Sequence, residues 1–427
     1  MIYNKIIPAL AGLMLASACT QNPPEASDKS IPTEPVETAN ANASAQGWLP
    51  DEADEALYNE RFQTLVEAFA SGAPTTVYDT LGPVRGSAVE RAFARSETGL
   101  SIVTKAEINA YAAANNSQAL IVMKDGVILH EAYFQDANKD TLIVGKSLAK
   151  PLGVIAVGMA IQAGMVESLD DPVADYVTEW QGTAKDQILV RHLLDMRTGL
   201  LPQANAPDAE NVLNRAYLHP SHDQVIIHEY PLVGTPGERY DYSNANAELV
   251  ASLIERATGE QYEDWIADQI LIPLGARGGE VWMNKPGGTA HAGCCILLPA
   301  RTWLLLADLV INDGIAGGQR LLPEGFVTQM ITPTPQNSHS AMGVYVGQPY
   351  LEYRGFLNPD IEIGKSYHSE PYLDEDLILF DGNSNQVVYM VPSQQLIVLR
   401  VGNSPPREPA WDNAFLANTV SLDLRLN

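Results

Sequence analysis

Cysteine is scarce in this sequence, which has three among 427 residues. No Cys-x-x-Cys pair and no zinc-finger spacing occurs, which excludes the common structural zinc sites and thioredoxin-like redox motifs. Two of the three, Cys294 and Cys295, are adjacent and precede an apolar segment. Because a disulfide between neighbouring residues is strained and uncommon, we expect two small buried thiols in a packed corner of the protein.

Basic residues are also few. The chain has 26 lysines and arginines against 52 aspartates and glutamates, which gives a formal net charge of -26. A nucleic-acid-binding protein needs a basic surface, so we expect no nucleic-acid partner. An acidic surface favours solubility and disfavours anionic partners, but it does not indicate a fold.

Two widespread hydrolase motifs are missing as well. The sequence has no Gly-x-Ser-x-Gly, which argues against an α/β-hydrolase, and no His-Glu-x-x-His, the zinc-protease motif. Three histidines lie close together in the sequence, at His219, His222 and His228. No carboxylate or cysteine pattern accompanies them, so we interpret them as loop histidines near a site. We expect no metal and no other cofactor.

The first residues resemble a bacterial secretion signal. Lys5 precedes an apolar run that is short for a membrane span and ends in small residues before Cys19. This pattern resembles a lipobox, which implies a cleaved signal peptide over 1–18 and acylation of Cys19. Thr20 in place of aspartate resembles lipoproteins of the Gram-negative outer membrane that face the periplasm. The alternative is an ordinary cleaved signal. Residues 19–50 are polar and proline-rich, typical of a disordered tether.

The rest of the chain divides into an extension and a main domain. Helical patterns over 51–70 and around 103–114 predict a helical N-terminal extension over 51–115. The main domain then spans 116–427. It begins with two short apolar runs joined by Asp125-Gly126, a strong hairpin signal.

The middle of this domain differs from its ends. Between about 165 and 340 the sequence favours helices and loops, and strand patterns return only after residue 340. The last of them predict a hairpin around 391–395 before a closing helix. This order favours the α+β class over alternating βαβ units. We expect an antiparallel sheet built from both ends of the chain and flanked by helices, together with an all-helical region.

Residues 141–164 read as one long helix with a reactive first turn. From Leu152 to Ile161 the residues are apolar on every side, which indicates a buried helix. Ser147 and Lys150 lie three residues apart, so they share one face of it. A serine hydroxyl needs an adjacent base to act as a nucleophile. Burial lowers the pKa of a lysine, so an apolar helix suits a neutral lysine base.

A second short motif supplies a partner for this pair. Tyr242 and Asn244 lie in a turn just before an amphipathic helix, and no other Tyr-x-Asn or Ser-x-Asn occurs in the sequence. Serine hydrolases with a Ser-x-x-Lys motif need a group that relays the proton, and a tyrosine beside the lysine can do so.

With these motifs in place, residues 118–403 resemble the β-lactamase-related serine hydrolases, which include class C β-lactamases, family VIII esterases and 6-aminohexanoate-dimer hydrolases. Further similar segments occur in the family's order, among them "VRHLLDMRTGL", "PGERYDYSN" and "NDGIAGGQRLLPEGFV". The resemblance implies a β-lactamase/transpeptidase-like fold. It also implies that Ser147 is the acylated nucleophile, Lys150 the base, Tyr242 the proton relay and Asn244 a hydrogen-bonding positioner.

The third motif of that family departs from its usual form. In β-lactamases it reads Lys-Thr-Gly or His-Thr-Gly, and the corresponding residues here are Asp381, Gly382 and Asn383. By this alignment the backbone N–H groups of Ser147 and Ser384 would form the oxyanion hole. An aspartate in place of the lysine would repel a substrate carboxylate. This difference disfavours β-lactams and D-Ala-D-Ala peptides.

We therefore expect a serine hydrolase that cleaves a small uncharged or cationic ester or amide through an acyl-enzyme. A β-lactamase or D-Ala-D-Ala peptidase is the alternative within the same chemistry. An alternative of another class is a non-catalytic lipoprotein that binds a partner in the cell envelope. The joint presence of Ser147, Lys150 and Tyr242 argues against that last alternative.

Overall fold

The computed structural model describes residues 48–71, 78–204, 206–359 and 364–426. The predicted signal peptide, Cys19 and nearly all of the predicted tether lie outside the described residues. In the part of the chain that is described, no helix has both the length and the apolar character needed to cross a membrane.

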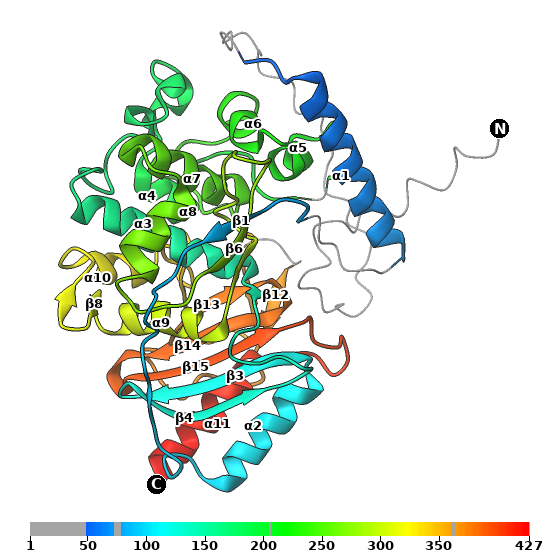
Figure 1. Ribbon diagram of the computed structural model, residues 1–427. Helices are drawn as coiled ribbons and strands as arrows, with labels where there is room; N and C mark the ends of the chain where they lie inside the picture. The colour runs from blue at the N-terminus through cyan, green and yellow to red at the C-terminus, as the bar shows by residue number, and fades with distance from the viewer. Residues whose placement is uncertain (1–47, 72–77, 205, 360–363, 427) are drawn as a thin grey trace.

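The largest sheet joins strands from both ends of the chain (Figure 1). Its order is β10-β13-β14-β15-β3-β4-β2. All neighbours are antiparallel except β2 and β4, which are parallel. The strands are β2 (Ala94–Arg95), β3 (Ser117–Lys124), β4 (Val127–Tyr133), β10 (Tyr345–Val346), β13 (Ile378–Gly382), β14 (Gln386–Val391) and β15 (Leu396–Gly402). The predicted hairpins at Asp125-Gly126 and at 391–395 are both confirmed.

Helices cover both faces of this sheet (Figure 1). Successive residues of a strand point to opposite faces. Accordingly Leu120 and Val122 of β3 pack in one apolar cluster with α2 (Ile102–Ala114) and α11 (Asn413–Leu426), while Ile121 packs in the other. That second cluster includes α9 (Ala300–Ile311) and the helical region. The predicted α+β architecture, with a sheet from both chain ends flanked by helices and a helical region, is confirmed.

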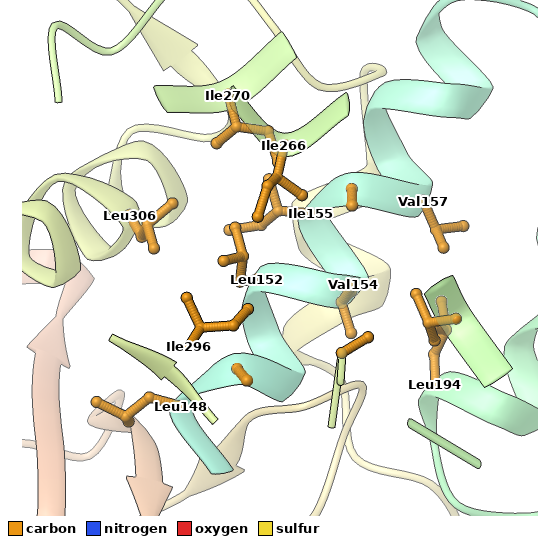
Figure 2. Close-up of a cluster of buried hydrophobic side chains, with 14 of the residues drawn as sticks. Leu148, Leu152, Val154, Ile155, Val157, Leu194, Ile266, Ile270, Ile296 and Leu306 are labelled. Carbon is orange, nitrogen blue, oxygen red and sulfur yellow. The ribbon is translucent and has the colours of Figure 1, made fainter. Parts of the chain in front are cut away.

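The nucleophile segment begins later than predicted. A 3-10 turn, η3 (Lys146–Leu148), leads into α3 (Ala149–Gln162), whose residues from Ala149 to Ala160 are all buried. Side chains of α3 pack against neighbouring helices on several sides (Figure 2). The prediction of one helix over 141–164 is wrong at its start, because the β-branched pair Ile143–Val144 forms strand β5.

Strand β5 belongs to a small second sheet, of order β1-β6-β7-β5. Its other strands are β1 (Leu81–Val84), β6 (Gly279–Trp282) and β7 (Ile296–Leu298). The sequence had predicted helices for the segment that contains β1, and helices and loops for the segment that contains β6 and β7. Strands of two to four residues are too short for the alternation of apolar and polar residues to be recognised.

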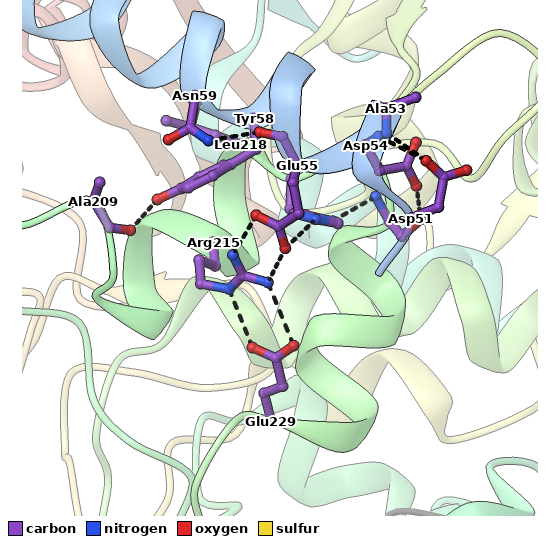
Figure 3. Close-up of polar contacts among 12 residues, drawn as sticks. Asp51, Ala53, Asp54, Glu55, Tyr58, Asn59, Ala209, Arg215, Leu218 and Glu229 are labelled. Atoms are coloured by element: carbon purple, nitrogen blue, oxygen red, sulfur yellow. Dashed lines mark hydrogen bonds and ion pairs between the residues drawn. The ribbon is translucent and has the colours of Figure 1, made fainter. Parts of the chain in front are cut away.

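The predicted helix over 51–70 is present as α1 (Glu52–Ser71), and it docks on the helical region. Figure 3 shows Arg215 of α5 (Val212–Leu218) between Glu55 of α1 and Glu229. The Arg215 guanidinium lies 2.8 Å from Glu55 and 3.1 Å from Glu229. The hydroxyl of Tyr58 donates a hydrogen bond to the carbonyl of Ala209. These contacts attach α1 to the helical region.

The remaining strands and the α- and π-helices of the described residues complete the helical region and the loops around it. They are α4 (Val190–Leu194), α6 (His222–His228), α7 (Asn244–Thr258), α8 (Tyr262–Ile266), the π-helical η7 (Ala267–Leu271), α10 (Phe326–Ile331), β8 (Ile315–Ala316), β9 (Gln319–Arg320), β11 (Tyr353–Gly355) and β12 (Lys365–Tyr367). Helix α7 ends at Gly259, which has a left-handed backbone (φ 77°).

Candidate active site

Three side chains from two segments meet at the start of α3. The Oγ of Ser147 lies 3.1 Å from the Nζ of Lys150 and 2.9 Å from the hydroxyl oxygen of Tyr242. Ser147 and Lys150 are one turn apart, and Tyr242 lies two residues before the start of α7. The structure thus brings together the three residues that the sequence suggested as nucleophile, base and proton relay.

Lys150 is buried beside Ser147. Its side chain is 7% exposed, and burial lowers its pKa to about 8, against the opposite effect of the nearby Glu248 carboxylate. A fraction of the lysine is therefore neutral at neutral pH, and that fraction grows quickly as the pH rises. A neutral lysine can accept a proton from serine.

The hydrogen bonds of Lys150 are arranged for a neutral amine. Besides Ser147, its Nζ contacts Asn244 Oδ1 at 3.0 Å and the carbonyl oxygen of Gly293 at 2.8 Å. Both of these oxygens can only accept. A neutral amine has two N–H donors and one lone pair, so the two acceptors can take its protons. The lone pair is then left for the Ser147 hydroxyl.

Tyr242 is fixed by its backbone and by its ring. Its N–H donates to the carbonyl of Leu357 at 2.8 Å, and its own carbonyl accepts from the N–H of Gln203 at 2.8 Å. The ring packs edge-on against Phe356, with centroids 5.7 Å apart. Lys150 Nζ lies 4.9 Å from the centre of the same ring. The hydroxyl is therefore positioned within reach of Ser147 by contacts on several sides.

Gly382, at the end of β13, lies directly against the nucleophile. A Cβ atom at Gly382 would stand 3.1 Å from the carbonyl oxygen of Gly145 and 3.2 Å from the backbone nitrogens of Ser147 and Leu148. Such distances are tighter than ordinary van der Waals contact, which explains why this residue has no side chain. The strand of the third motif therefore passes beside Ser147, as the alignment requires.

Asp381 is not the free charge that the sequence analysis expected to repel a substrate carboxylate. Its side chain is 12% exposed and forms an ion pair with Arg354, which is 4% exposed. Burial raises the pKa of the Asp381 carboxyl, and the Arg354 guanidinium opposes this rise. Asp381 and Gly382 are consecutive residues of β13, so they face opposite sides of the sheet. The expectation of an unpaired negative charge at this site is wrong, because Arg354 compensates it.

Asn383 and Ser384 form the turn that follows. They belong to η8 (Asn383–Asn385), which connects β13 to β14, and Ser384 has a left-handed backbone (φ 65°). The Ser384 carbonyl accepts a hydrogen bond from Arg400 at 2.7 Å, and its hydroxyl contacts that of Ser404 at 2.8 Å. Both contacts anchor the turn beside the nucleophile.

The three histidines near residue 220 do not form a cluster. His222 and His228 are at the two ends of α6, so they are not loop residues. His219 lies 3.5 Å from Glu55, and His228 stacks on Trp48. Of the three, only His222 approaches Glu248, the carboxylate near Lys150.

There His222 meets two residues that the sequence analysis missed, Glu248 and His291. All three are buried. Burial raises the pKa of Glu248, lowers that of His222 and lowers that of His291 to about 3. One signal was available: Glu248 is four residues after Asn244 and so shares its helix face. His291 is brought in from the β6–β7 connection, which no local pattern predicts.

Cys294 and Cys295 form a disulfide. The expectation of two separate thiols is therefore wrong, although Cys295 is fully buried as predicted. The left-handed backbone of Cys295 (φ 62°) makes the tight local turn in which the two neighbours meet. The pair directly follows Gly293, the carbonyl partner of Lys150.

Comparison with known proteins gives a consistent result. A family model described as Beta-lactamase matches residues 108–420. The 6-aminohexanoate-dimer hydrolase of Paenarthrobacter ureafaciens is 24% identical over 232 residues, which are 50% of this chain and 57% of that protein. The match therefore spans little more than half the length of this relative.

Solved structures share the fold. A Bacillus anthracis protein assigned as a 6-aminohexanoate-dimer hydrolase superposes with a TM-score of 0.60 at 15% identity, over 90% of this chain and 96% of that one. A class C β-lactamase from Rhodobacter sphaeroides superposes with a TM-score of 0.51 at 18% identity, over 76% of this chain and 98% of that one. The β-lactamase/transpeptidase-like fold expected from the sequence is confirmed.

Proposed function

Since the chain belongs to the Beta-lactamase family, whose members are serine hydrolases, we propose that it hydrolyses a small ester or amide through an acyl-enzyme on Ser147. The observation behind the proposal is the contact of the Ser147 hydroxyl with both Lys150 and Tyr242, at 3.1 and 2.9 Å. A nucleophile next to a buried amine and a phenol has both the base and the acid that acyl transfer needs.

In the acylation step, neutral Lys150 accepts the Ser147 proton while Oγ attacks the substrate carbonyl carbon. The Tyr242 hydroxyl lies beside the same Oγ and passes its proton to the leaving group as the tetrahedral intermediate collapses. The Lys150 ammonium then returns a proton to the Tyr242 oxygen, so that both groups regain their starting forms. A water molecule, deprotonated by neutral Lys150, then attacks the acyl carbonyl carbon. The bond to Ser147 Oγ breaks, Oγ takes a proton back from Lys150, and the carboxylic acid is released. Asn244 and Gly293 hold the lysine amine in place through both steps.

The negative charge on the substrate oxygen requires two backbone donors. One is the N–H of Ser147. For the second we propose the N–H of Asn383, because Gly382 is the residue that touches the nucleophile turn. This choice is one residue earlier than the Ser384 N–H suggested by sequence alignment, which stays as the alternative donor.

The substrate is proposed to be uncharged near the reacting carbonyl. The two strand residues before the glycine offer no free cation: Phe380 is buried and apolar, and Asp381 is paired with Arg354. Lys146, next to the nucleophile, is turned to the Tyr78 hydroxyl at 3.1 Å. A relative named for hydrolysis of the 6-aminohexanoate dimer makes an amide a reasonable second choice beside an ester.

The proposed location is the periplasmic face of a Gram-negative outer membrane, with Cys19 as lipid anchor. The lipobox-like sequence before Cys19 supports it. Labelling of cells with an alkyne fatty acid should tag the wild type but not Cys19→Ala. A wild type that takes up no label would overturn the anchor without affecting the enzymatic proposal.

A fluorophosphonate probe tests the enzymatic proposal directly. It should label the wild type on Ser147, as located by mass spectrometry of the peptide, and should not label Ser147→Ala. Ser393→Ala, which changes an exposed serine in the turn after β14, is the matched control and should label normally. A wild type that folds but neither labels nor turns over any ester would support the non-catalytic binding lipoprotein instead.

A further inference from the structure

A second cluster of ionisable side chains lies behind the catalytic lysine. Gly293 separates the two: its carbonyl binds Lys150, and a Cβ on Gly293 would stand 2.8 Å from Oε1 of Glu248. Around Glu248 are His222 from α6 and His291 from the β6–β7 connection. The nearest nitrogens of these histidines lie 3.7 and 3.5 Å from Oε2 of Glu248.

These side chains have no normal hydrogen-bond partners. Among the described residues, both ring nitrogens of His222, both of His291 and both carboxylate oxygens of Glu248 are buried without one. The N–H groups of Ala292 and Gly293 approach the carboxylate, but not in hydrogen-bond geometry. The hydroxyls of Ser252, one turn further along α7, and Tyr262 on α8 are also buried without a partner.

Such a group of buried atoms is unfavourable unless something binds them. Each buried polar atom without a partner costs about 1–3 kcal/mol, and a charged one costs more. A cation among two neutral imidazoles and a carboxylate would satisfy ring nitrogens and carboxylate oxygens together. Two histidines and one glutamate are also a ligand set that zinc uses in proteins, with water as fourth ligand.

The separations agree with a single ion. Zinc–ligand distances of about 2.1 Å require ligand atoms no more than about 4.2 Å apart. The two histidine–carboxylate separations, 3.5 and 3.7 Å, are within that limit. The ligand atoms of all three residues lie within 4.8 Å of one another, so a small closure is enough to bring them to one centre.

We propose that His222, Glu248 and His291 bind one divalent transition-metal ion of the zinc class. The ion would connect α6, α7 and the β6–β7 connection behind the active site. Its role is structural, because no catalytic atom of the proposed mechanism is among the ligands. This site differs from the histidine set suggested by sequence spacing, since it uses only His222 of that set and takes its carboxylate from another helix.

Metal binding requires one rearrangement. The rings of His222 and His291 are stacked, with centroids 4.1 Å apart and planes 14° from parallel. An imidazole binds a metal in its own ring plane, so parallel rings cannot both do so at one ion. His291 is also stacked on Trp282 at 3.9 Å. The His291 ring is therefore held by stacked rings on two sides, whereas for His222 the only stacking contact given is with His291. We expect the His222 ring to turn about its Cβ–Cγ bond when the metal binds.

The test is metal content and metal titration of the full-length protein, prepared without a histidine tag. Chelator-treated wild type should take up one equivalent of Zn²⁺ in calorimetry and should gain thermal stability. Co²⁺ in place of Zn²⁺ should give the visible absorption of a nitrogen- and oxygen-ligated ion. His228→Gln changes the histidine at the other end of α6 and is the matched control; it should behave as the wild type.

Glu248→Gln and His291→Gln should each lose the stoichiometric uptake and the cobalt spectrum while keeping the wild-type circular dichroism. Wild-type protein that binds neither ion at concentrations well above micromolar would overturn the proposal, as would full uptake by Glu248→Gln. If a variant fails to fold, the wild-type titration still decides. None of these outcomes depends on catalytic activity, so the metal proposal and the hydrolase proposal stand or fall separately.

Discussion

The side-chain oxygen of Asn244, the first residue of α7, lies 3.0 Å from the Nζ of Lys150. Together with the Gly293 carbonyl it takes the two N–H protons of a neutral amine and directs the lone pair to Ser147. An acceptor without charge is important here, because a carboxylate at the same distance would favour the ammonium form. The relationship leads to two predictions about pH.

The first prediction concerns the wild type. The kcat/KM for a neutral ester should rise with pH and reach a plateau above a midpoint near 8, because burial lowers the pKa of Lys150 to about 8. Below that pH the amine is protonated and cannot accept the Ser147 proton. The measurement is an initial-rate profile from mildly acidic to alkaline pH. A midpoint at the ordinary lysine value, or a flat profile, would contradict the role of Lys150 as base.

The second prediction concerns Asn244→Asp. The new carboxylate would stabilise the Lys150 ammonium, so the midpoint of the same profile should move up by about one unit or more. Asn138→Asp, at an exposed loop position, adds the same charge where solvent screens it and should leave the midpoint unchanged. Equal midpoints in the two variants would show that Asn244 does not act on the base.

The sequence predicted this arrangement in part. Ser147 and Lys150 on one helix face, and Tyr242 and Asn244 before another helix, were both visible as local patterns. Gly293 was not, because its part in the site is a backbone carbonyl brought in by the β6–β7 connection. Local spacing indicates which side chains share a helix face, but it cannot indicate which loop from elsewhere lies against that face.

The third motif shows the same limit. The alignment correctly brought Gly382 to the nucleophile, but it treated Asp381 as a free charge. Arg354, which compensates that charge, is 27 residues earlier in the sequence, on a short strand that the sequence did not predict. Ion pairs between distant segments depend on tertiary packing, so only the folded chain identifies them.

Tyr242→Phe should lower kcat for ester hydrolysis by about a hundredfold, the low end of what a proton-transfer group contributes. Lys150→Ala should cost more, about a thousandfold or beyond, because it removes the base itself. The phenylalanine keeps the edge-on contact with Phe356, so the melting temperature should change little. Comparable kcat values for Tyr242→Phe and the wild type would exclude the phenol as proton relay.

Gly382→Ala should abolish most activity while the protein stays folded. The added methyl group would meet the backbone of Gly145, Ser147 and Leu148 at 3.1–3.2 Å. To relieve this contact, strand β13 must shift away from the nucleophile turn. The shift would misplace the oxyanion donors, which should lower kcat by about a hundredfold or more. Gly234→Ala is the control, since its added Cβ would have no neighbour closer than 3.7 Å. Full activity of Gly382→Ala would mean that this strand does not take part in the site.

The last prediction concerns substrate preference and separates two explanations of it. We expect a higher kcat/KM for an ester such as p-nitrophenyl butyrate than for a chromogenic cephalosporin, because Asp381 stands where the β-lactamase motif has a lysine or histidine. If Asp381 were a free charge, Asp381→Asn would relieve repulsion and improve the cephalosporin relative to the ester by about tenfold or more. Because Asp381 is paired with Arg354 and faces away from Gly382, we expect that ratio to change less than about threefold.

The same variant should instead lower the free energy of unfolding by about 3–5 kcal/mol, since it leaves a buried guanidinium without its partner. A large change in the ratio with unchanged stability would show that Asp381 faces the substrate after all.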